Sequence, residues 1–225
     1  MDTAEEADDY DAMNHSEVNR AFCEDALRAL PSGKKGRLRV LDLGTGTALI
    51  PIQLCMMDKT TEIVATDFAK HMLALAEANV ARANLTDRIA LSFGDAKTSD
   101  LPDASFDLVM SNSVIHHIPE PLDLLRAAVS KTAIGGVLFL RDLERPQTES
   151  EVARLVEQYA ALGSEAPVGE PERKRAERQR ALFAASLRAA LTLEEIRSLG
   201  AELGIPEVAS TRTSDRHWTL VWTRT

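Results

Sequence analysis

The chain has 225 residues, of which 44% are hydrophobic and 27% charged, a composition typical of a soluble globular protein. This length is enough for one full α/β domain and short for two. The net charge of -9 disfavours nucleic acid as the main partner, and no apolar run reaches the length of a membrane span. Because the first residues are acidic and do not form a signal sequence, we expect a cytoplasmic protein without a membrane partner.

The segment before the first strand predicts one helix. Asn14 and Glu17 have the spacing of a capping box, so this helix is expected to begin near His15 and to end before Pro31. The two cysteines, Cys23 and Cys55, lie in apolar helical contexts without metal-type spacing. We therefore expect buried free thiols and neither a disulfide nor a metal site.

From Leu38 onward, short apolar runs alternate with helical patterns. Strands are expected over 40–43, 62–67, 88–93, 106–110 and 137–140, and helices from Leu49, over 69–83 and over 121–133. Gly135 and Gly136 are expected to stop the last of these helices. Such alternation implies an α/β fold in which helices cover both faces of a parallel sheet.

The pattern changes after residue 143. Residues 143–191 contain no strand pattern but two expected helices, over 148–162 and 172–191, the first opened by a Thr148/Glu151 capping box. A third helix follows a Thr192/Glu195 box, and two closing strands are expected over 206–211 and 217–222. The inserted helices indicate a cap over the core and not a second domain.

One stretch, from Arg39 to Pro51, suggests a ligand site. It places Gly44-Thr45-Gly46 between an apolar run and a helical pattern, a plan that lets backbone N–H groups approach a ligand closely. Asp42 ends the run just before these glycines. An acid there would repel a pyrophosphate and attract a cation, and the dinucleotide pattern G-x-G-x-x-G is absent.

Polar side chains end every predicted parallel strand. They are Asp42, Asp67, Asp95, Asn112 and Asp142. The carboxyl ends of such strands line the ligand crevice, and Asp67 lies about twenty residues past the glycines, where an acid can bind the hydroxyls of a ribose. The ligand should therefore contain a nucleoside. NAD and S-adenosylmethionine both qualify, and Asp42 favours the second.

Four segments together resemble the class I S-adenosylmethionine-dependent methyltransferases in order and spacing. They are 40–47, 65–73, 93–96 and 106–118, and the resemblance covers about residues 37–142. It implies a three-layer Rossmann-like, doubly wound fold, with a mostly parallel seven-stranded sheet whose last strand is antiparallel and inserted between strands five and six. The expected single domain comprises an N-terminal helical lid (1–36), a cofactor-binding core (37–142), a helical cap insertion (143–191) and a closing segment (192–225).

The resemblance also implies roles for individual residues. Asp42, Gly44, Thr45 and Gly46 would hold the methionine portion of the cofactor, and Asp67 the ribose hydroxyls. Phe68 and Met72 would flank the adenine, Asp95 and Ala96 would read its amino edge, and Asn112 and Ser113 would border the sulfonium. Ala48 stands where many members have a third glycine, a difference that is expected to change little.

Catalytic and acceptor-binding residues are less clearly indicated. His116 and His117 follow the strand over 106–110, and a histidine there could deprotonate an acceptor amine, phenol or thiol. Alternatively, one caps the next segment and the other packs under the cofactor, since many such transfers need only proximity. His15, Asn19 and Arg141 are candidate acceptor contacts; lid or structural roles for the first two and a salt bridge for Arg141 stay open.

The sequence thus predicts an enzyme that transfers a methyl group from S-adenosylmethionine to an N, O or S nucleophile of a small molecule, leaving S-adenosylhomocysteine. Residues 111–114 lack the aromatic side chain with which base-modifying enzymes stack a flipped base, so nucleic acid is not an expected acceptor. Two alternatives stay open: a catalytically silent module that binds S-adenosylmethionine, and a nicotinamide-dependent oxidoreductase, which Asp42 disfavours.

Overall fold

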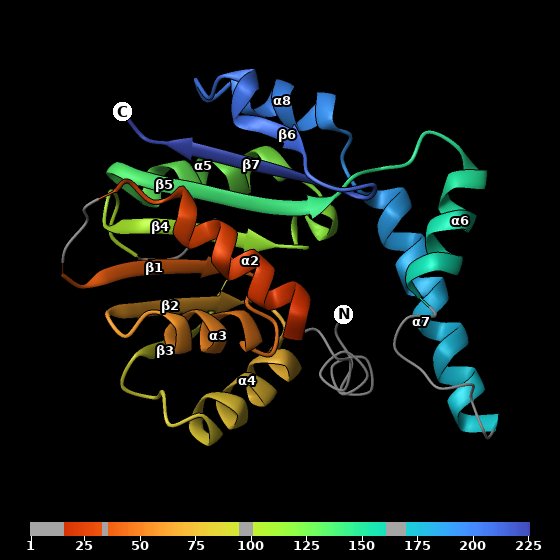
Figure 1. Cartoon of the computed structure of the whole chain (residues 1–225), viewed down its shortest axis with the longest axis horizontal. Helices are drawn as coiled ribbons and strands as arrows, with labels where there is room; N and C mark the ends of the chain where they lie inside the picture. The colour runs from red at the N-terminus through yellow and green to blue at the C-terminus, as the bar shows by residue number, and fades with distance from the viewer. Residues whose placement is uncertain (1–15, 33–35, 95–100, 161–169) are drawn as a thin grey trace.

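Seven strands form one sheet in the structure, a computed structural model that describes residues 16–32, 36–94, 101–160 and 170–225 (Figure 1). The strands are β1 (Leu38–Leu43), β2 (Thr61–Asp67), β3 (Ile89–Phe93), β4 (Phe106–Asn112), β5 (Thr132–Leu143), β6 (Ser210–Arg212) and β7 (His217–Thr223). Their order is β3-β2-β1-β4-β5-β7-β6, and β7 alone runs antiparallel to its neighbours. The predicted α/β architecture, with the last strand between strands five and six, is confirmed.

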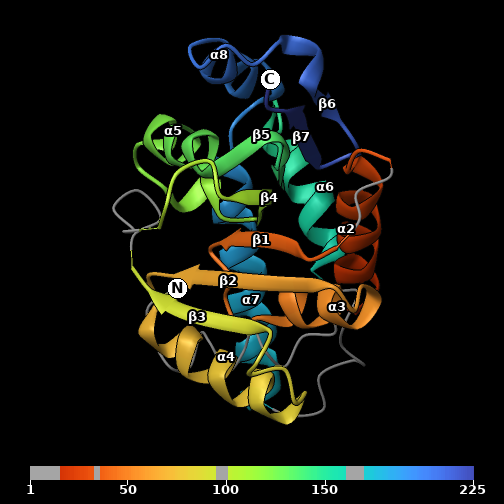
Figure 2. The ribbon, with the colours of Figure 1, turned by 90° about the vertical axis from the view of Figure 1, so that its left-hand side faces the viewer.

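Helices cover both faces of the sheet (Figures 1 and 2). On one face lie α2 (Ser16–Ala29), α3 (Leu49–Met57) and α4 (Lys70–Arg82), and on the other lie α5 (Pro121–Lys131) and α8 (Leu193–Ala201). Neighbouring residues of a strand serve opposite faces: Val40 belongs to the core under α2 and α3, and Leu41 to the core under α5 and α8. Burial on both sides explains why these strands read as continuous apolar runs.

Helix α2 packs on the face of the sheet and not across the edge where its strands end. Its Phe22, Cys23 and Ala26 are buried, and the Phe22 ring meets Phe139 of β5 edge to face, with 5.1 Å between ring centroids. Cys23 and Cys55 of α3 are both buried free thiols, as predicted. The described part of the N-terminal segment therefore contributes to the core of the protein.

The start of β5 differs from the prediction. The helix expected to reach residue 133 ends at Lys131, and β5 begins at Thr132, so it contains both glycines that were expected to stop the helix. Gly135 has φ +76°, and the pairing of β5 with β4 shifts register opposite this point. A Cβ at Gly136 would lie 2.9 Å from the carbonyl oxygen of Phe106. The two glycines thus form an irregularity within a strand.

The first closing strand, β6, also starts later than expected, whereas β7 begins at His217 as predicted. Residues Glu207–Ala209 form a 3-10 turn, η2, in place of the first half of the strand predicted over 206–211. Pro206 lacks the N–H that a sheet ladder requires, which accounts for the late start of β6. The capping boxes at Thr148 and Thr192 are both present, whereas Asn14 lies outside the described residues.

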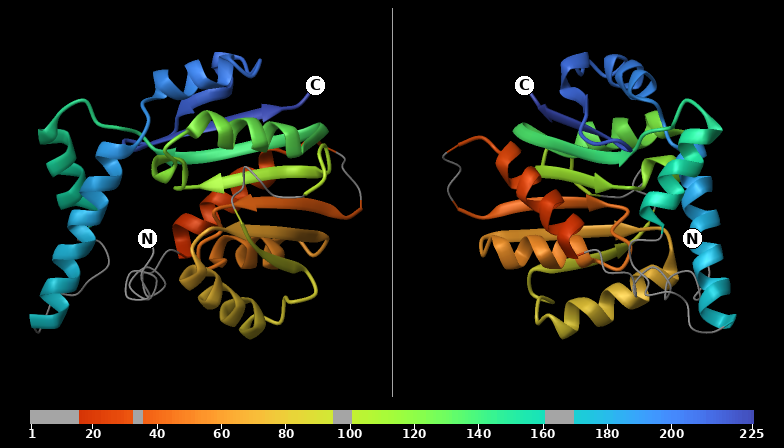
Figure 3. Two further views of the ribbon diagram at one scale, coloured as in Figure 1. Left: turned by 180° about the vertical axis from the view of Figure 1, so that it is seen from behind. Right: turned by 45° about the vertical axis from the view of Figure 1, so that its right-hand side comes forward.

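The predicted insertion forms a helical hairpin, which we call the arm, comprising α6 (Glu149–Tyr159) and α7 (Glu170–Ala189). It stands apart from the helices of both layers, beyond the carboxyl ends of β1, β4 and β5 (Figures 1 and 3). The two helices share a small core of their own, which contains Leu143, Val152, Leu155, Val156, Leu187 and Ala190. Glu144 and Leu191 form a β-bridge where the arm leaves and re-enters the body.

A second set of contacts, which we call the latch, joins the arm to the turn between β6 and β7. The Tyr159 hydroxyl donates to Asp215 at 2.9 Å and 3.0 Å, and the Arg216 guanidinium lies 3.4 Å from the centroid of the Tyr159 ring. Arg154 forms an ion pair with the same carboxylate at 3.6 Å. Among the described residues, no helix has both the length and the apolar character needed to cross a membrane.

Candidate functional site

The predicted strand-end residues lie along one edge of the sheet. Asp42 of β1 is in register with Ala65 and Met110, and Asn112 of β4 is in register with Arg141 of β5. Parallel pairing thus brings the ends of β1, β2, β4 and β5 together, as expected for a ligand crevice. Asp95, Ala96 and His15 lie outside the described residues.

The glycine turn after β1 requires its first glycine for two reasons. Gly44 has φ +74°, and a Cβ added there would overlap both methyl groups of Val114. The N–H groups of Gly44 and Thr45 both donate to the carbonyl oxygen of Thr66 at 2.9 Å. The segment that follows β4 therefore lies directly against the turn, and the turn is fastened to β2.

Ala48, the departure from the family pattern, occupies a strained position. Its φ of 63° and ψ of 22° lie in the left-handed region, and its side chain is buried. An L-residue pays about 1–2 kcal/mol for this conformation, which glycine adopts freely. Burial of the methyl group offsets this strain, so the expectation that alanine changes little here stays a prediction.

Asp42 is a buried acid beside the turn, with only 3% of its surface exposed. Burial raises the pKa of Asp42 to about 7, and the charge of Asp67 acts in the same direction. The Thr45 hydroxyl lowers this pKa in part, although it lies outside strict hydrogen-bond geometry. The hydroxyl of Thr47 is also buried, without a partner among the described residues. A cationic group seated beside Asp42 would stabilise its ionised form.

Asp67 connects the turn to the next helix. One carboxylate oxygen accepts from the N–H of Gly46 at 2.7 Å and the other from the N–H of Ala69 at 2.8 Å. Each oxygen keeps lone-pair capacity for a further donor, such as a ribose hydroxyl. Asp67 is thus both a structural clamp of the turn and an available acceptor at the site.

Two aromatic side chains beside this acid are exposed. Phe68 is 71% exposed and Phe93 is 52% exposed, and their rings stack with centroids 5.8 Å apart. Lys70 places its ammonium 5.1 Å from the Phe93 ring centroid. Met72, by contrast, is buried in the core. Sequence reasoning missed Phe93, because an apolar residue that ends a strand is typical of a core position; its place before Gly94 was the available signal.

The segment after β4 carries the remaining candidates. Asn112 is half-buried at the end of β4, and Ser113 has φ +57°, a strained conformation of the kind found at functional sites. The N–H of Ser113 donates to the carbonyl oxygen of Arg141 at 2.9 Å. A 3-10 turn, η1 (Ile115–His117), follows at once and holds both predicted histidines.

His116 is paired with a buried carboxylate from the neighbouring strand. Its Nδ1 lies 2.6 Å from Oδ1 of Asp142, and the two side chains are 4% and 1% exposed. Asp142 also accepts from the N–H groups of Ile115 at 2.6 Å, of His116 at 3.3 Å and of Leu143 at 2.6 Å. The sequence analysis placed Asp142 at the edge but did not connect it to a histidine.

The ring of His117 lies against that of His116 in a tilted arrangement, with centroids 4.0 Å apart and an interplanar angle of 46°. Surrounding protein atoms and the neighbouring His116 lower the pKa of His117 to about 4, although part of the ring surface stays in solvent. His117 is therefore neutral at physiological pH. His117 thus offers an imidazole ring without a positive charge in the segment that follows β4.

Arg141 forms the salt bridge that the sequence left open. Its guanidinium donates to Asp25 of α2 at 2.8 Å and to the Thr219 hydroxyl at 3.0 Å, and it lies 5.7 Å from the centroid of the Phe22 ring. These contacts tie α2 to β5 and β7. Asn19, on the same helix, is half-buried.

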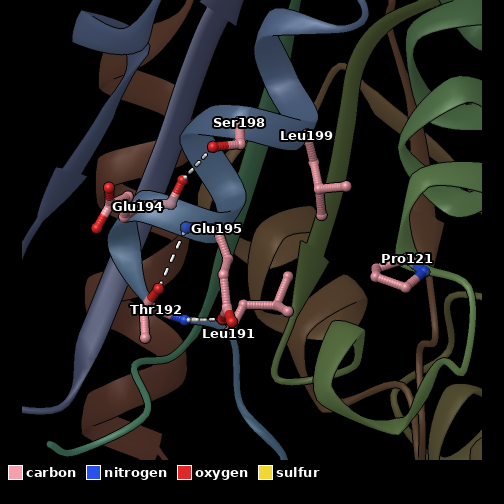
Figure 4. A pocket seen from close by; sticks show the side chains of 7 residues that line it. All are labelled: Pro121, Leu191, Thr192, Glu194, Glu195, Ser198 and Leu199. Carbon is pink, nitrogen blue, oxygen red and sulfur yellow. Dashed lines mark hydrogen bonds between the residues drawn. The ribbon is translucent and has the colours of Figure 1, made fainter.

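A groove of ≈ 480 Å³ lies between the start of α5 and α8 (Figure 4). It is lined by Pro121, Leu191, Thr192, Glu194, Glu195, Ser198 and Leu199. Figure 4 shows that Thr192 and Glu195 are occupied with capping α8, and that the Ser198 hydroxyl donates to the Glu194 carbonyl. Among the described residues, no cluster of His, Cys, Asp and Glu could hold a metal ion.

Comparisons with known proteins agree with the fold. A family model described as a methyltransferase domain matches residues 34–205. The ubiquinone biosynthesis O-methyltransferase of Xanthomonas campestris is 28% identical over 126 residues, which cover 55% of this chain and 50% of that protein. The chain spans half or less of the length of the curated relatives that it matches first.

Two solved structures share the fold. A S-adenosylmethionine-dependent methyltransferase from Aquifex aeolicus superposes with a TM-score of 0.63 at 15% identity, covering 98% of both chains. The plantazolicin methyltransferase, solved with a substrate analogue and S-adenosylhomocysteine, gives a TM-score of 0.68 at 12% identity, covering 94% of this chain and 86% of its own. The chain therefore belongs to the methyltransferase-domain family, and its fold is that of the class I S-adenosylmethionine-dependent methyltransferases.

Proposed function

We propose that the protein transfers the methyl group of S-adenosylmethionine to an N, O or S nucleophile of a small molecule. The observation that carries this proposal is the acid–glycine–acid edge formed by Asp42, the turn at Gly44–Gly46 and Asp67. A buried acid in this place suits an ammonium group and disfavours a pyrophosphate, which separates the proposal from nicotinamide chemistry.

The cofactor-binding residues follow from this arrangement. Asp42 and the turn, with Thr45, would hold the methionine portion, and Asp67 would accept from the ribose hydroxyls with its remaining lone pairs. Phe68, with Phe93 added to the predicted set, offers an exposed aromatic surface for the adenine. Asn112 and Ser113 would border the sulfonium. Met72, Asp95 and Ala96 are kept as predicted adenine contacts.

The chemistry asks little of the protein beyond orientation and proton removal. An in-line displacement needs the acceptor atom held against the methyl carbon, and residues at the ends of β4 and β5 lie where they can do this. His116 and His117 are the proposed proton acceptors. Arg141 is already engaged by Asp25, so we assign it to the anchoring of α2 rather than to the acceptor, and we keep His15 and Asn19 as acceptor candidates.

A small-molecule acceptor is supported by the relatives, whose names include methyltransferases of ubiquinone biosynthesis and of 27-O-demethylrifamycin SV. The acceptor side of this chain would be formed by η1, α2 and the arm. Helix α2 and the arm lie outside the four segments that resemble the family, so those segments do not identify the acceptor.

Calorimetric titration tests the cofactor assignment directly. S-adenosylhomocysteine should bind with a dissociation constant of about micromolar order, and NADH should not bind at a hundredfold higher concentration, about 2.7 kcal/mol weaker. Methyl transfer from labelled S-adenosylmethionine to a panel of phenols, amines and thiols then tests activity. Binding of NADH in preference would overturn the proposal, and cofactor binding without turnover of any acceptor would favour the catalytically silent module.

A further inference from the structure

We propose that Asp142 is a positioning residue that holds His116 ready to take a proton, and that the methylated atom is accordingly a hydroxyl oxygen. This inference rests on the proposed function, because it names the acceptor class of the same site. It goes beyond that function in assigning separate tasks to Asp142 and His116. The geometry of the Asp142–His116 pair carries it.

The pair is built by the sheet and not by local sequence. Asp142 and His116 are 26 positions apart, and they meet because Asn112 at the end of β4 pairs with Arg141 at the end of β5. All four contacts of the carboxylate, from three backbone N–H groups and Nδ1 of His116, converge on a side chain that is 1% exposed. A carboxylate so fully bonded is rigid, and it fixes the orientation of the imidazole ring.

This contact also selects the tautomer of His116. The carboxylate of Asp142 accepts, so the proton of the neutral imidazole lies on Nδ1 and the lone pair lies on Nε2. Nε2 has no hydrogen-bond partner in the described part of the chain. It is not fully buried, so it keeps some contact with solvent. It is therefore the ring atom free to accept a proton.

The segment just before His116 lies against the glycine turn. Val114, two residues before His116, is the side chain that a Cβ at Gly44 would strike, so η1 follows directly from the segment against the glycine turn. Helix α7 of the arm packs against η1. The turn η1, which carries His116, thus lies between the proposed site of the methyl donor and the arm. We expect the acceptor to enter there.

The proton balance explains why a hydroxyl is the favoured acceptor. The hydroxyl oxygen forms a bond to the methyl carbon, the electron pair of the carbon–sulfur bond goes to the sulfur, and the hydroxyl proton goes to Nε2 of His116. The product is a methyl ether, a neutral thioether and an imidazolium, which Asp142 stabilises across 2.6 Å. A neutral amine can attack through its lone pair and lose its proton afterwards, and a thiol of pKa about 8.5 ionises readily, whereas a phenol of pKa about 10 gains most from a base.

A purely structural role makes a different prediction. If Asp142 only capped η1 through the N–H groups of Ile115 and His116, the ring of His116 would be dispensable, and its tautomer would have no effect on turnover. Asp142→Asn separates the two roles. The amide oxygen can still accept from the backbone, but the amide nitrogen faces Nδ1 as a donor, which favours the tautomer with its proton on Nε2.

Nitrogen-15 NMR of the imidazole rings tests the positioning in the full chain with S-adenosylhomocysteine present. We expect the Nδ1–H tautomer for His116 in the wild type and the Nε2–H tautomer in Asp142→Asn. The imidazole signal that disappears in His116→Gln is the signal of His116. His217→Gln is the matched control, since His217 is another largely buried histidine, bonded to Ser214 and outside the pair. An Nε2–H tautomer in the wild type would overturn the proposal.

Turnover of two phenols tests the chemistry at about pH 8. Phenol has a pKa of about 10 and keeps its proton there, whereas 4-nitrophenol is largely ionised and needs no base. Asp142→Asn and His116→Gln should lose about a hundredfold in rate with phenol and less than about threefold with 4-nitrophenol. His217→Gln should leave both rates unchanged. His116→Gln preserves the backbone contacts of Asp142, so it carries the test where Asp142→Asn fails to fold.

The outcomes distinguish this inference from the proposed function. Equal losses with both phenols, in a variant that still binds S-adenosylhomocysteine, would overturn the role of the pair and leave the methyltransferase in place. Wild-type turnover of amines or thiols but of no hydroxyl compound would overturn the acceptor class. Failure of the wild type to bind S-adenosylhomocysteine would overturn both.

Discussion

The edge of the sheet has two halves that are built in different ways. At the ends of β1 and β2, the site is formed mainly by backbone groups: the left-handed glycines of the turn and the N–H group of Gly46, which donates to Asp67. At the ends of β4 and β5, side chains from distant segments meet, as in the His116–Asp142 pair and the contact of Arg141 with Asp25. The first half is defined by local backbone geometry and the second by the register of the sheet.

The largest effect should come from the glycine turn. Gly44→Ala combines a left-handed backbone, about 1–2 kcal/mol, with overlap against Val114, about 1–3 kcal/mol, so the free energy of unfolding should fall by about 3 kcal/mol. Ala48→Gly is the matched control, because relief of backbone strain is offset by lost burial of a methyl group, and the change should stay within about 1 kcal/mol. Urea denaturation measures both. Equal effects would show that the turn tolerates any small residue.

Asp42, the acid beside the glycine turn, should make the stability of the protein depend on pH. Burial raises the pKa of Asp42 to about 7, from about 3.9 in an unfolded chain, so its favourable contribution to stability is intact below about pH 4 and is lost as pH rises through about 7. Asp42→Asn should therefore stabilise the ligand-free protein by about 2 kcal/mol at pH 8 and by little at pH 4, while weakening S-adenosylhomocysteine binding.

Denaturation of both proteins at the two pH values measures this difference. Asp123→Asn, which alters an exposed acid of α5, should show no such dependence. A stabilisation by Asp42→Asn that is independent of pH would mean that burial does not hold the carboxyl in its protonated form. The half of the edge at β1 and β2 would then have no buried acid with a raised pKa.

Asp67 tests the link between the turn and the ribose. Asp67→Ala removes the acceptor for the N–H groups of Gly46 and Ala69, and it should weaken S-adenosylhomocysteine binding at least tenfold, about 1.4 kcal/mol. Asp67→Asn, which keeps one acceptor oxygen, should lose less. Calorimetric titration gives both affinities, and an unchanged affinity in Asp67→Ala would contradict the ribose assignment.

The smallest effect should come from the latch, which joins the arm to the turn between β6 and β7 and lies outside both halves of this edge. Tyr159→Phe removes the hydroxyl that donates to Asp215, a partly exposed contact worth about 0.5–1 kcal/mol. Hydrogen exchange in α6 should become faster, while S-adenosylhomocysteine affinity stays the same. Asp215→Asn should behave similarly. A loss of cofactor affinity in either variant would show that the arm and the glycine turn are coupled.

Local features could be predicted from the sequence. The strand before Gly44, the acids at positions 42 and 67 and the capping boxes at Thr148 and Thr192 each depend on residues a few positions apart, and the structure contains them. The antiparallel β7 was expected from family resemblance, because no residue pattern distinguishes its direction. Not every local feature could be predicted. Ala48 has a left-handed backbone, and the sequence does not indicate it because alanine rarely adopts that conformation.

Contacts between distant segments could not be predicted. The pairing of His116 with Asp142 depends on the register of β4 against β5, which the sequence alone does not specify. Phe93 resembles a core residue until β3 is seen to end at the surface beside Phe68. Gly135 and Gly136 resemble a helix stop, because glycine serves helix ends and strand irregularities equally well.

The bridge between Glu144 and Leu191 gives the arm an unusual independence. Both ends of the hairpin leave the body at the same place, and Arg145 reinforces it by donating to the carbonyl oxygens of Leu191 and Ala190. A segment with adjoining ends can be exchanged for another of different length at little entropic cost to the rest of the chain. Under the proposed function, exchange of the arm would therefore change the acceptor, while the sheet and the glycine turn that hold the methyl donor stay the same.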